Sequence, residues 1–299
     1  LLYLRMFEFP IHSPVEHIDL PFCKDIHLDI KRDDMIHPFI SGNKWRKLKY
    51  LLRTAHSTHK QKLVTFGGSY SNHLLATACA AARFGFQSIG FVRGEETLSL
   101  NDVLFLCRQF GMRLIYIDRK SYKNKMDLFD QYFGDDADAF FIDEGGASEE
   151  AVQGCAELVT ELVTRYDHIV LACGTASTMS GIIRGVAQHQ LPTRVEGICI
   201  HKGSEELLRN IQAYCPGHTQ WTLHTGHHLG GYARTTTTYL QWLSDFSRST
   251  GILLDPVYTG KMMLALSDLA TSGYFAPNSR ILAVHTGGLF GILGMKEKF

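Results

Sequence analysis

The sequence predicts an α/β protein built from open parallel sheets that are flanked by helices. Short β-rich runs alternate with longer helical patterns along the chain, which is typical of parallel α/β architecture. The 299 residues are 45% hydrophobic and 20% charged, which is enough apolar material for one large core or for two lobes. We therefore expect an ordered globular protein.

The predicted strands are short apolar runs, and several of them end at glycine. They cover residues 26–30, 62–66, 88–92, 113–117, 139–142, 168–172, 194–200 and 280–285. Between them, the Ala-rich stretch at 72–84 has helical spacing and is followed by Gly85, a residue that favours helix C-termini. Ser148 is expected to open another helix, with Glu149 and Glu150 in its first turn, where carboxylates complement the helix dipole.

Composition and charge exclude several classes of protein. Thirty basic and thirty acidic side chains give no long-range field that would favour nucleic acid or an anionic membrane. No apolar stretch of about 20 residues is present, and residues 1–7 are interrupted by Arg5, so we expect neither a membrane helix nor a signal peptide. The seven cysteines include no C-x-x-C pair and indicate no disulfide framework. We expect a cytoplasmic protein.

Lys44 is the first candidate for chemistry. Most lysines in a basic run lie on a solvated helix face, but the neighbours of Lys44 favour another role. Gly42 permits an unusual backbone conformation, and Asn43 is expected to cap a helix that has Lys44 in its first turn. Because the positive end of a helix disfavours a further cation, we expect a lowered pKa and a nucleophilic amine at Lys44.

The loop at 173–181 is the second candidate. A predicted strand runs into small residues, and a helix is expected to begin near Thr178. Backbone N–H groups, the hydroxyls of Thr175, Ser177 and Thr178, and the helix dipole together suit an oxyanion such as phosphate. The order of a P-loop and the G-x-G-x-x-G turn are both absent. A tight turn that binds nothing remains an alternative.

Together with downstream motifs, these segments resemble the pyridoxal-phosphate enzymes of the 1-aminocyclopropane-1-carboxylate deaminase and D-cysteine desulfhydrase family. The resemblance spans nearly the whole chain in family order and rests on Gly42-Asn43-Lys44, Gly67-Gly68, Ser71-Asn72-His73, Asp255-Pro256-Val257-Tyr258-Thr259-Gly260-Lys261 and His285-Thr286-Gly287-Gly288. It implies a two-lobed fold like that of the tryptophan synthase β subunit (fold type II). The small domain would cover residues 50–154, and the large cofactor-binding domain residues 1–49 plus 155–299. It also implies a homodimer.

The same resemblance assigns residue roles. Lys44 would hold pyridoxal 5'-phosphate as a Schiff base and move protons at a small amino-acid substrate. Asn72 would bond to the phenolic oxygen of the cofactor, and Tyr258 would act as an acid, base or nucleophile, with Ser71 also catalytic. The remaining cofactor ligands would be Gly174, Thr175, Ala176, Ser177, Thr178 and Thr286. The substrate would contact Ser71, His73, Tyr232, Tyr258 and Thr259. No metal is implied.

Two positions indicate the reaction. Deaminases of the family typically have glutamate after the D-P-V-Y tyrosine and leucine in the H-x-G-G turn, whereas this chain has Thr259 and Thr286. A hydroxyl in place of a carboxylate leaves the pyridine nitrogen closer to neutral, which suffices for β-elimination of a good leaving group. We expect a D-cysteine desulfhydrase-like lyase that gives pyruvate, ammonia and sulfide. The alternatives are a 1-aminocyclopropane-1-carboxylate deaminase that gives 2-oxobutyrate and ammonia, and a catalytically silent cofactor-binding protein.

Other residues depart from the family pattern or carry no clear role. Tyr70 stands where relatives commonly have glutamine. Arg234 is either a partner for an acidic substrate group or a surface arginine. His224, His227 and His228 lie close in sequence without a matching Cys, Asp or Glu spacing, so we expect a loop rather than a metal site.

Overall fold

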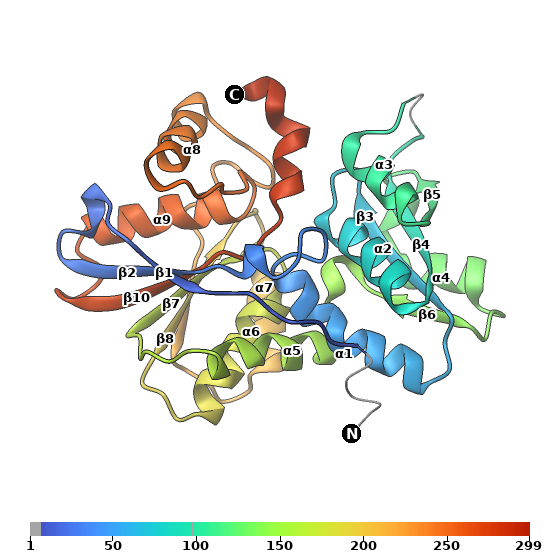
Figure 1. Cartoon of the computed structure of the whole chain (residues 1–299), viewed down its shortest axis with the longest axis horizontal. Coiled ribbons are helices and arrows are strands. Elements are labelled where there is room, and N and C mark those ends of the chain that lie inside the picture. Colours follow the sequence, from blue (N-terminus) through green and yellow to red (C-terminus); the bar gives the residue numbers. More distant parts are fainter. Residues whose placement is uncertain (1–6, 97–98) are drawn as a thin grey trace.

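The structure, a computed structural model, describes residues 7–96 and 99–299 and contains two sheets that form two lobes side by side (Figure 1). One sheet has six strands in the order β1-β2-β10-β7-β8-β9, and the other has four in the order β5-β4-β3-β6. The predicted two-lobed α/β class is confirmed. Residues 1–6, on which the expectation about a signal peptide mainly depends, lie outside the described part.

The six-stranded sheet is parallel except at one edge. Its strands are β1 (Val15–Ile18), β2 (Ile26–Lys31), β7 (His168–Cys173), β8 (Arg194–Cys199), β9 (Trp221–His224) and β10 (Ser279–Val284). Only β1 runs antiparallel to its neighbour β2. The edge strands β1 and β9 were not predicted from the sequence.

The four-stranded sheet is parallel throughout. Its strands are β3 (Lys62–Gly68), β4 (Gln87–Arg93), β5 (Arg113–Ile117) and β6 (Ala139–Ile142). Every predicted strand in the two sheets is present, and its ends differ from the prediction by no more than two residues.

The helices are α1 (Asn43–Ser57), α2 (Asn72–Phe84), α3 (Asp102–Gln109), α4 (Lys125–Phe133), α5 (Glu149–Thr160), α6 (Ala176–Gln188), α7 (Ser204–Tyr214), α8 (Thr237–Thr250) and α9 (Thr259–Thr271), followed by the 3-10 segment η6 (Leu289–Lys298). The predictions for α2 and α5 are confirmed. Gly85 ends α2 with a φ of 79°, and the Ser148 hydroxyl caps α5 by accepting a bond from the Ala151 N–H at 3.1 Å.

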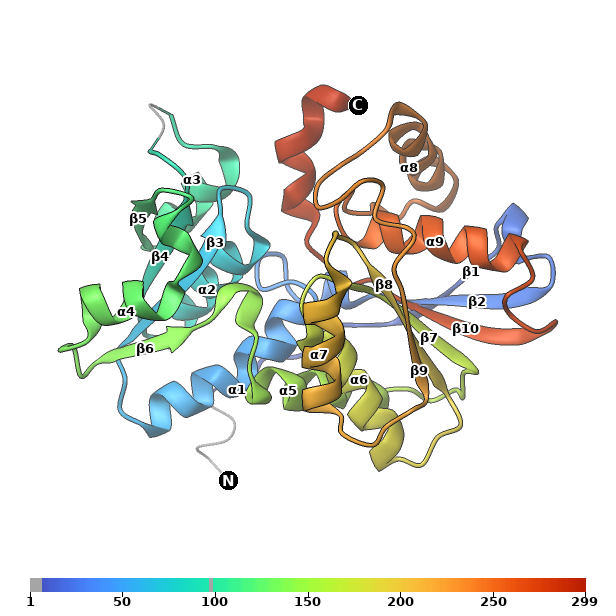
Figure 2. The same cartoon turned by 180° about the vertical axis from the view of Figure 1, so that it is seen from behind.

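Alternate residues of the central strands enter two separate cores. In β7, Ile169 and Leu171 pack toward α6 and α7, whereas Val170 and Ala172 pack toward α8 and α9. Figure 2 shows α6 and α7 on one side of the sheet, and α8 and α9 on the other. This period of two explains why the buried strands read as continuous apolar runs.

Three helices stack where the two lobes meet. The Cβ that a side chain would add at Gly154 of α5 would lie 1.9 Å from the backbone oxygen of Arg46 in α1, and one at Gly181 of α6 would lie 2.4 Å from the Cys155 side chain. Only glycine allows such close approach. The predicted domain limits at residues 50 and 154 fall inside α1 and α5, and the division into domains stays a prediction.

Within the described ranges, no helix combines the length and the apolar character needed to cross a bilayer. All seven cysteines are buried thiols.

Candidate active site

The N-terminus of α1 is held against the turn that follows β10. Gly42 is the N-cap, with a φ of 61°, and an added Cβ would lie 1.9 Å from the Thr286 backbone oxygen. The Asn43 N–H donates to that oxygen at 3.2 Å, and its side-chain amide donates to the Thr178 hydroxyl at 3.0 Å. The prediction that Asn43 caps the helix was therefore wrong, because contacts distant in sequence set both residues.

Lys44 lies in the first turn of α1, as predicted. Burial, reinforced by the neighbouring charge of Lys47, lowers the pKa of the Lys44 amine to about 7. Its Nζ has only a long contact, 3.5 Å, with the Gly145 backbone oxygen, and it forms no ion pair with any described residue. A large fraction of this amine is therefore neutral and nucleophilic at physiological pH.

Lys47 lies one helical turn after Lys44 and was not predicted to be a functional residue. It is buried, and its Nζ donates to the Gly145 oxygen and to the Thr175 hydroxyl, each at 3.0 Å. Burial also lowers the pKa of this amine. The spacing of three residues, which places both lysines on one helix face, is the sequence pattern that indicates this pair.

The loop after β7 presents donors toward the same place. Helix α6 begins at Ala176 with Thr175 as its N-cap, two residues earlier than predicted. The Ser177 hydroxyl is fully buried and has no hydrogen-bond partner within residues 7–96 and 99–299. Gly174 packs under Tyr258, because an added Cβ would lie 2.6 Å from the tyrosine ring. A helix N-terminus with a buried unpaired hydroxyl and the Lys47 ammonium beside it suits an anion.

The loop after β3 contributes a second set of polar groups. Ser71 is the N-cap of α2, and its hydroxyl accepts a bond from the Leu74 N–H at 3.2 Å. The Asn72 side-chain oxygen is buried and unpartnered, and its amide nitrogen lies 3.1 Å from the position that a Cβ of Gly288 would take. The buried His73 ring contacts the Thr65 hydroxyl at 2.8 Å.

Tyr258 and Tyr232 face each other across the turn that precedes α9. The Tyr258 hydroxyl donates to the Tyr232 hydroxyl at 3.3 Å, and the two rings are T-shaped with centroids 6.0 Å apart. Burial raises the pKa of Tyr258 well above its usual value. In the same turn, the Thr259 hydroxyl accepts a bond from the Asp255 N–H at 2.9 Å.

The contacts bring most of the predicted residues together at one place. Lys44 lies near Gly145, which also adjoins Thr175, and Lys47 bonds to Thr175 directly. The helices α2 and α6 follow parallel strands, as does the turn at Thr286, so the site lies at the carboxyl ends of the strands. Among the described residues no hydrogen bond joins Ser71, His73 or Thr259 to Lys44, although burial and then the charges of Lys44 and Lys47 lower the pKa of His73. Their roles toward a substrate stay predictions.

The site fits pyridoxal phosphate. The cofactor needs an amine for its aldehyde, donors for its phosphate and a polar partner for its ring oxygen. The near-neutral Lys44 amine, the unpartnered Ser177 hydroxyl with the Lys47 ammonium bonded to the N-cap residue of the same helix, and the Asn72 side-chain amide supply these three groups. Buried polar atoms without partners are uncommon in folded proteins, so the Ser177 hydroxyl and the Asn72 oxygen, each at the start of a helix that follows a parallel strand, indicate a ligand.

The three histidines interact separately. His224 Nε2 lies 2.9 Å from Glu196, His227 lies 3.7 Å from Asp268, and His228 accepts a bond from a backbone N–H of its own loop. Among the described residues, no group of three or more His, Cys, Asp or Glu is arranged to hold a metal.

The two residues that depart from the family pattern lie in different settings. The Tyr70 ring packs on η6, because an added Cβ at Gly294 would lie 2.8 Å from it. Arg234 is exposed, and no described residue pairs with its guanidinium.

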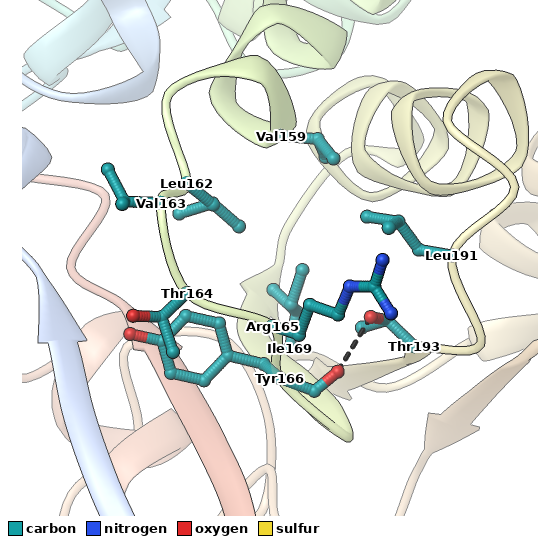
Figure 3. Close-up of a pocket in the computed structure, with 9 residues that line it drawn as sticks. All are labelled: Val159, Leu162, Val163, Thr164, Arg165, Tyr166, Ile169, Leu191 and Thr193. Atoms are coloured by element: carbon teal, nitrogen blue, oxygen red, sulfur yellow. Dashed lines mark hydrogen bonds between the residues drawn. The ribbon is translucent and has the colours of Figure 1, made fainter.

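A pocket of about 170 Å³ lies elsewhere (Figure 3). It is lined by residues including Tyr166, Ile169 and Thr193, at the amino end of β7. Because parallel sheets bind ligands at the carboxyl ends of strands, this pocket lies at the wrong end of the sheet to be the active site.

Comparison with known proteins agrees with this assignment. A family model described as pyridoxal-phosphate dependent enzyme matches residues 17–287. A putative 1-aminocyclopropane-1-carboxylate deaminase of Pyrococcus abyssi is 29% identical and covers 98% of this chain and 94% of its own. The mitochondrial bifunctional D-cysteine desulfhydrase/1-aminocyclopropane-1-carboxylate deaminase of Arabidopsis thaliana is 28% identical, with coverages of 94% and 77%. A solved structure of an ACC deaminase homologue has 27% identity and a TM-score of 0.86, and covers 99% of this chain and 98% of its own.

Proposed function

Because the chain belongs to the family of pyridoxal-phosphate dependent enzymes, we propose that it is a lyase that converts D-cysteine and water to pyruvate, ammonia and sulfide. The names of its relatives include both D-cysteine desulfhydrase and 1-aminocyclopropane-1-carboxylate deaminase, so similarity alone leaves both reactions open. The residue that follows Tyr258 favours the first reaction.

That residue is Thr259, which is fully buried at the start of α9. Its hydroxyl accepts a hydrogen bond from the Asp255 N–H, so it brings no negative charge to the position where the deaminase branch typically has glutamate. The carboxyl group of Asp255 in the same turn is only partly ionised at neutral pH, because burial raises its pKa to about 7. A ring nitrogen near these groups would stay close to neutral, which is adequate for β-elimination.

Besides the Lys44 amine, residues of the chain would hold the cofactor at two points. When bound, pyridoxal phosphate supplies an electron-withdrawing ring conjugated to the substrate nitrogen. Ser177, Lys47 and the first N–H groups of α6 would bind its phosphate, and the Asn72 amide would meet its ring oxygen.

Lys44 and the tyrosine pair would move the protons. With a pKa of about 7, the Lys44 amine is suited to remove the α-proton at neutral pH. The bond between the β-carbon and sulfur then breaks, and the electron pair leaves with sulfur. Tyr258 keeps its phenolic proton because burial raises its pKa, and its hydroxyl pair with Tyr232 is a donor for the departing sulfur.

The experiment compares two substrates on the purified holoenzyme. We expect pyruvate to form from D-cysteine faster than 2-oxobutyrate forms from 1-aminocyclopropane-1-carboxylate. The opposite ranking would favour the deaminase. A protein that shows the cofactor absorbance band, yet releases neither ammonia nor keto acid from a wider panel of amino acids, would be a silent cofactor binder.

We also infer a cytoplasmic homodimer. Seven buried free thiols suit a reducing compartment. Light scattering coupled to size-exclusion chromatography should give a mass of twice 33.6 kDa, and a monomer mass would contradict the inference.

A further inference from the structure

Lys261 is a fully buried lysine of α9 whose ammonium has no carboxylate partner among the described residues. Its Nζ donates instead to backbone oxygens, to Gly231 at 2.7 Å and to His228 at 2.9 Å, with Ile200 at 3.5 Å. Lysine is rarely buried completely, and here the hydrogen bonds of the cation go to carbonyl oxygens, while Asp255 acts on it only through its charge at longer range. The two short bonds go to a single loop, residues 225–236.

This loop has an unusual backbone. Leu229, Gly230, Gly231 and Ala233 all have positive φ angles, of 54°, 91°, 131° and 55°. Leucine and alanine rarely adopt this conformation, and such strained residues persist only where surrounding contacts impose them. The carbonyl groups that accept from Lys261 lie directly before Leu229 and at the end of the first strained run.

The loop also carries one half of the tyrosine pair. Tyr232 follows Gly231 directly, and its hydroxyl accepts the bond from Tyr258. Tyr258 lies three residues before Lys261, at the N-cap of the same helix. A single ammonium group therefore connects the helix that bears Tyr258 with the strained loop that bears Tyr232. The side chain of Tyr232 is otherwise half exposed, at 52%.

We propose that Lys261 is a positioning residue that holds the 225–236 loop in its strained form and so fixes the Tyr232 hydroxyl opposite Tyr258. The two tyrosines then border the substrate side chain and present a hydroxyl group to it. This arrangement favours a small amino acid whose leaving atom can accept a proton. This selection rests on the proposed function, whereas the positioning of the loop does not.

The test combines loop dynamics with kinetics. In Lys261→Met, which keeps an unbranched side chain one atom shorter and removes its donors, we expect faster amide hydrogen exchange across residues 228–234 and an unchanged cofactor absorbance band. The value of kcat/KM for D-cysteine should fall roughly 10- to 100-fold, because small misplacements of catalytic groups have effects of this size. Lys202→Met is the control: its exposed side chain adjoins Gly231 and makes no such bonds, so neither measurement should change.

A double-mutant cycle with Tyr232→Phe separates positioning from general stability. Removing the hydroxyl should lower kcat/KM in the native background and have little further effect in Lys261→Met. Additive losses, or native exchange rates in the loop, would overturn the proposal. If Lys261→Met does not fold, Lys261→Gln takes its place. Its amide keeps one donor group, so the loop amides should exchange faster than in the wild type. If the wild type does not react with D-cysteine, the proposed function fails, and the exchange experiment still decides the role of Lys261.

Discussion

The two faces of helix α1 contain buried cations in opposite situations. On one face, Arg46 donates to Asp33 at 2.6 Å and to Glu161 at 2.7 Å, and Lys31 pairs with the same Glu161 at 2.8 Å. On the other face, Lys44 and Lys47 contact only carbonyl and hydroxyl oxygens. In the first group two cations pair with two carboxylates, whereas in the second neither amine forms an ion pair with any residue that the structure describes.

The difference shows how a fold and a site use the same residue types. Burying an ion pair fixes geometry but leaves no capacity for a ligand. Burying amines without carboxylates lowers their pKa values, as it does for both Lys44 and Lys47, and keeps them available. An anionic cofactor would supply the missing negative charge. Substitutions on the two faces should therefore have different consequences, one set for function and the other for stability.

The largest expected effect is the loss of function in Lys44→Ala. Without this amine, the cofactor absorbance band near the visible edge should disappear, and turnover should fall by roughly 10³-fold or more. Urea unfolding of the apoprotein should change little, because the amine has no ion pair to lose. A variant that keeps both the band and the activity would show that another amine, most simply Lys47, carries the cofactor.

The second effect is on stability. In Arg46→Met, Asp33 stays buried, and among the described residues the Ser13 hydroxyl gives the side-chain hydrogen bond that it keeps, with the Lys31 charge farther away. We expect a loss of about 3–5 kcal/mol in the free energy of unfolding. Urea denaturation at pH 7, where Asp33 is ionised, measures this loss. Arg46 holds the Asp33 pKa below its usual value, so the penalty should shrink in acid as the carboxyl group is protonated.

A matched variant sharpens the interpretation. Replacing both partners, in Asp33→Leu with Arg46→Met, removes the uncompensated charge and should recover much of the lost stability. If the single and double variants are equally unstable, the shape of the guanidinium, rather than its charge, is what this face of α1 requires.

The sequence identified most of this architecture because its patterns are local. The β-rich runs and small-residue turns predicted the inner strands, and Gly42, Lys44 and the residues after β7 indicated a reactive amine and an anion site. The edge strands β1 and β9 were missed, since each has only four residues and almost none of them is fully buried.

Failures at the site have a different physical origin. The role of Lys47 depends on Thr175, which lies 128 residues away, and the basic run around it resembles a solvated face. Asn43 carries a good capping side chain, but Gly42 takes the cap because the chain there must pass within van der Waals contact of Thr286. Long-range contacts of this kind leave no periodic trace in the sequence.

The third prediction concerns Lys47. Lys47→Met removes the ammonium that adjoins the N-terminus of α6, and we expect the dissociation constant of pyridoxal phosphate to rise roughly 10- to 100-fold, the range for a hydrogen bond to a charged group. Titration of the absorbance band measures it. Binding of pyridoxal, which lacks the phosphate, should be unaffected.

Lys49→Met is the control on the same helix. Lys49 pairs with Glu157 at 2.8 Å near the surface, so its loss should leave cofactor binding unchanged and cost at most about 1 kcal/mol of stability. Equal losses of affinity in both variants would mean that overall positive charge, rather than the contact of Lys47 with Thr175, attracts the phosphate.

The smallest effect comes from comparing two buried aspartates. Asp33 has an arginine partner, whereas Asp255 forms no ion pair with the described residues, and burial raises its pKa from 3.8 to about 7 even though Lys261 opposes the shift. The folded protein therefore binds a proton that the unfolded chain releases in this window, so the contribution of Asp255 to stability falls as pH rises from about 4 to 7.

Asp255→Asn keeps an oxygen for the Val257 and Tyr258 N–H groups but does not titrate. Relative to the wild type, its free energy of unfolding should rise by more than about 1 kcal/mol between pH 5 and pH 8, since one pKa unit corresponds to about 1.4 kcal/mol. The exposed Asp245→Asn should show no such divergence in urea unfolding at the two pH values. Parallel pH profiles for Asp255→Asn and the wild type would mean that Asp255 is as well compensated as Asp33. In that case, Lys44 and Lys47 would be the buried active-site groups that differ from the ion-paired charges beside α1, and Asp255 would not.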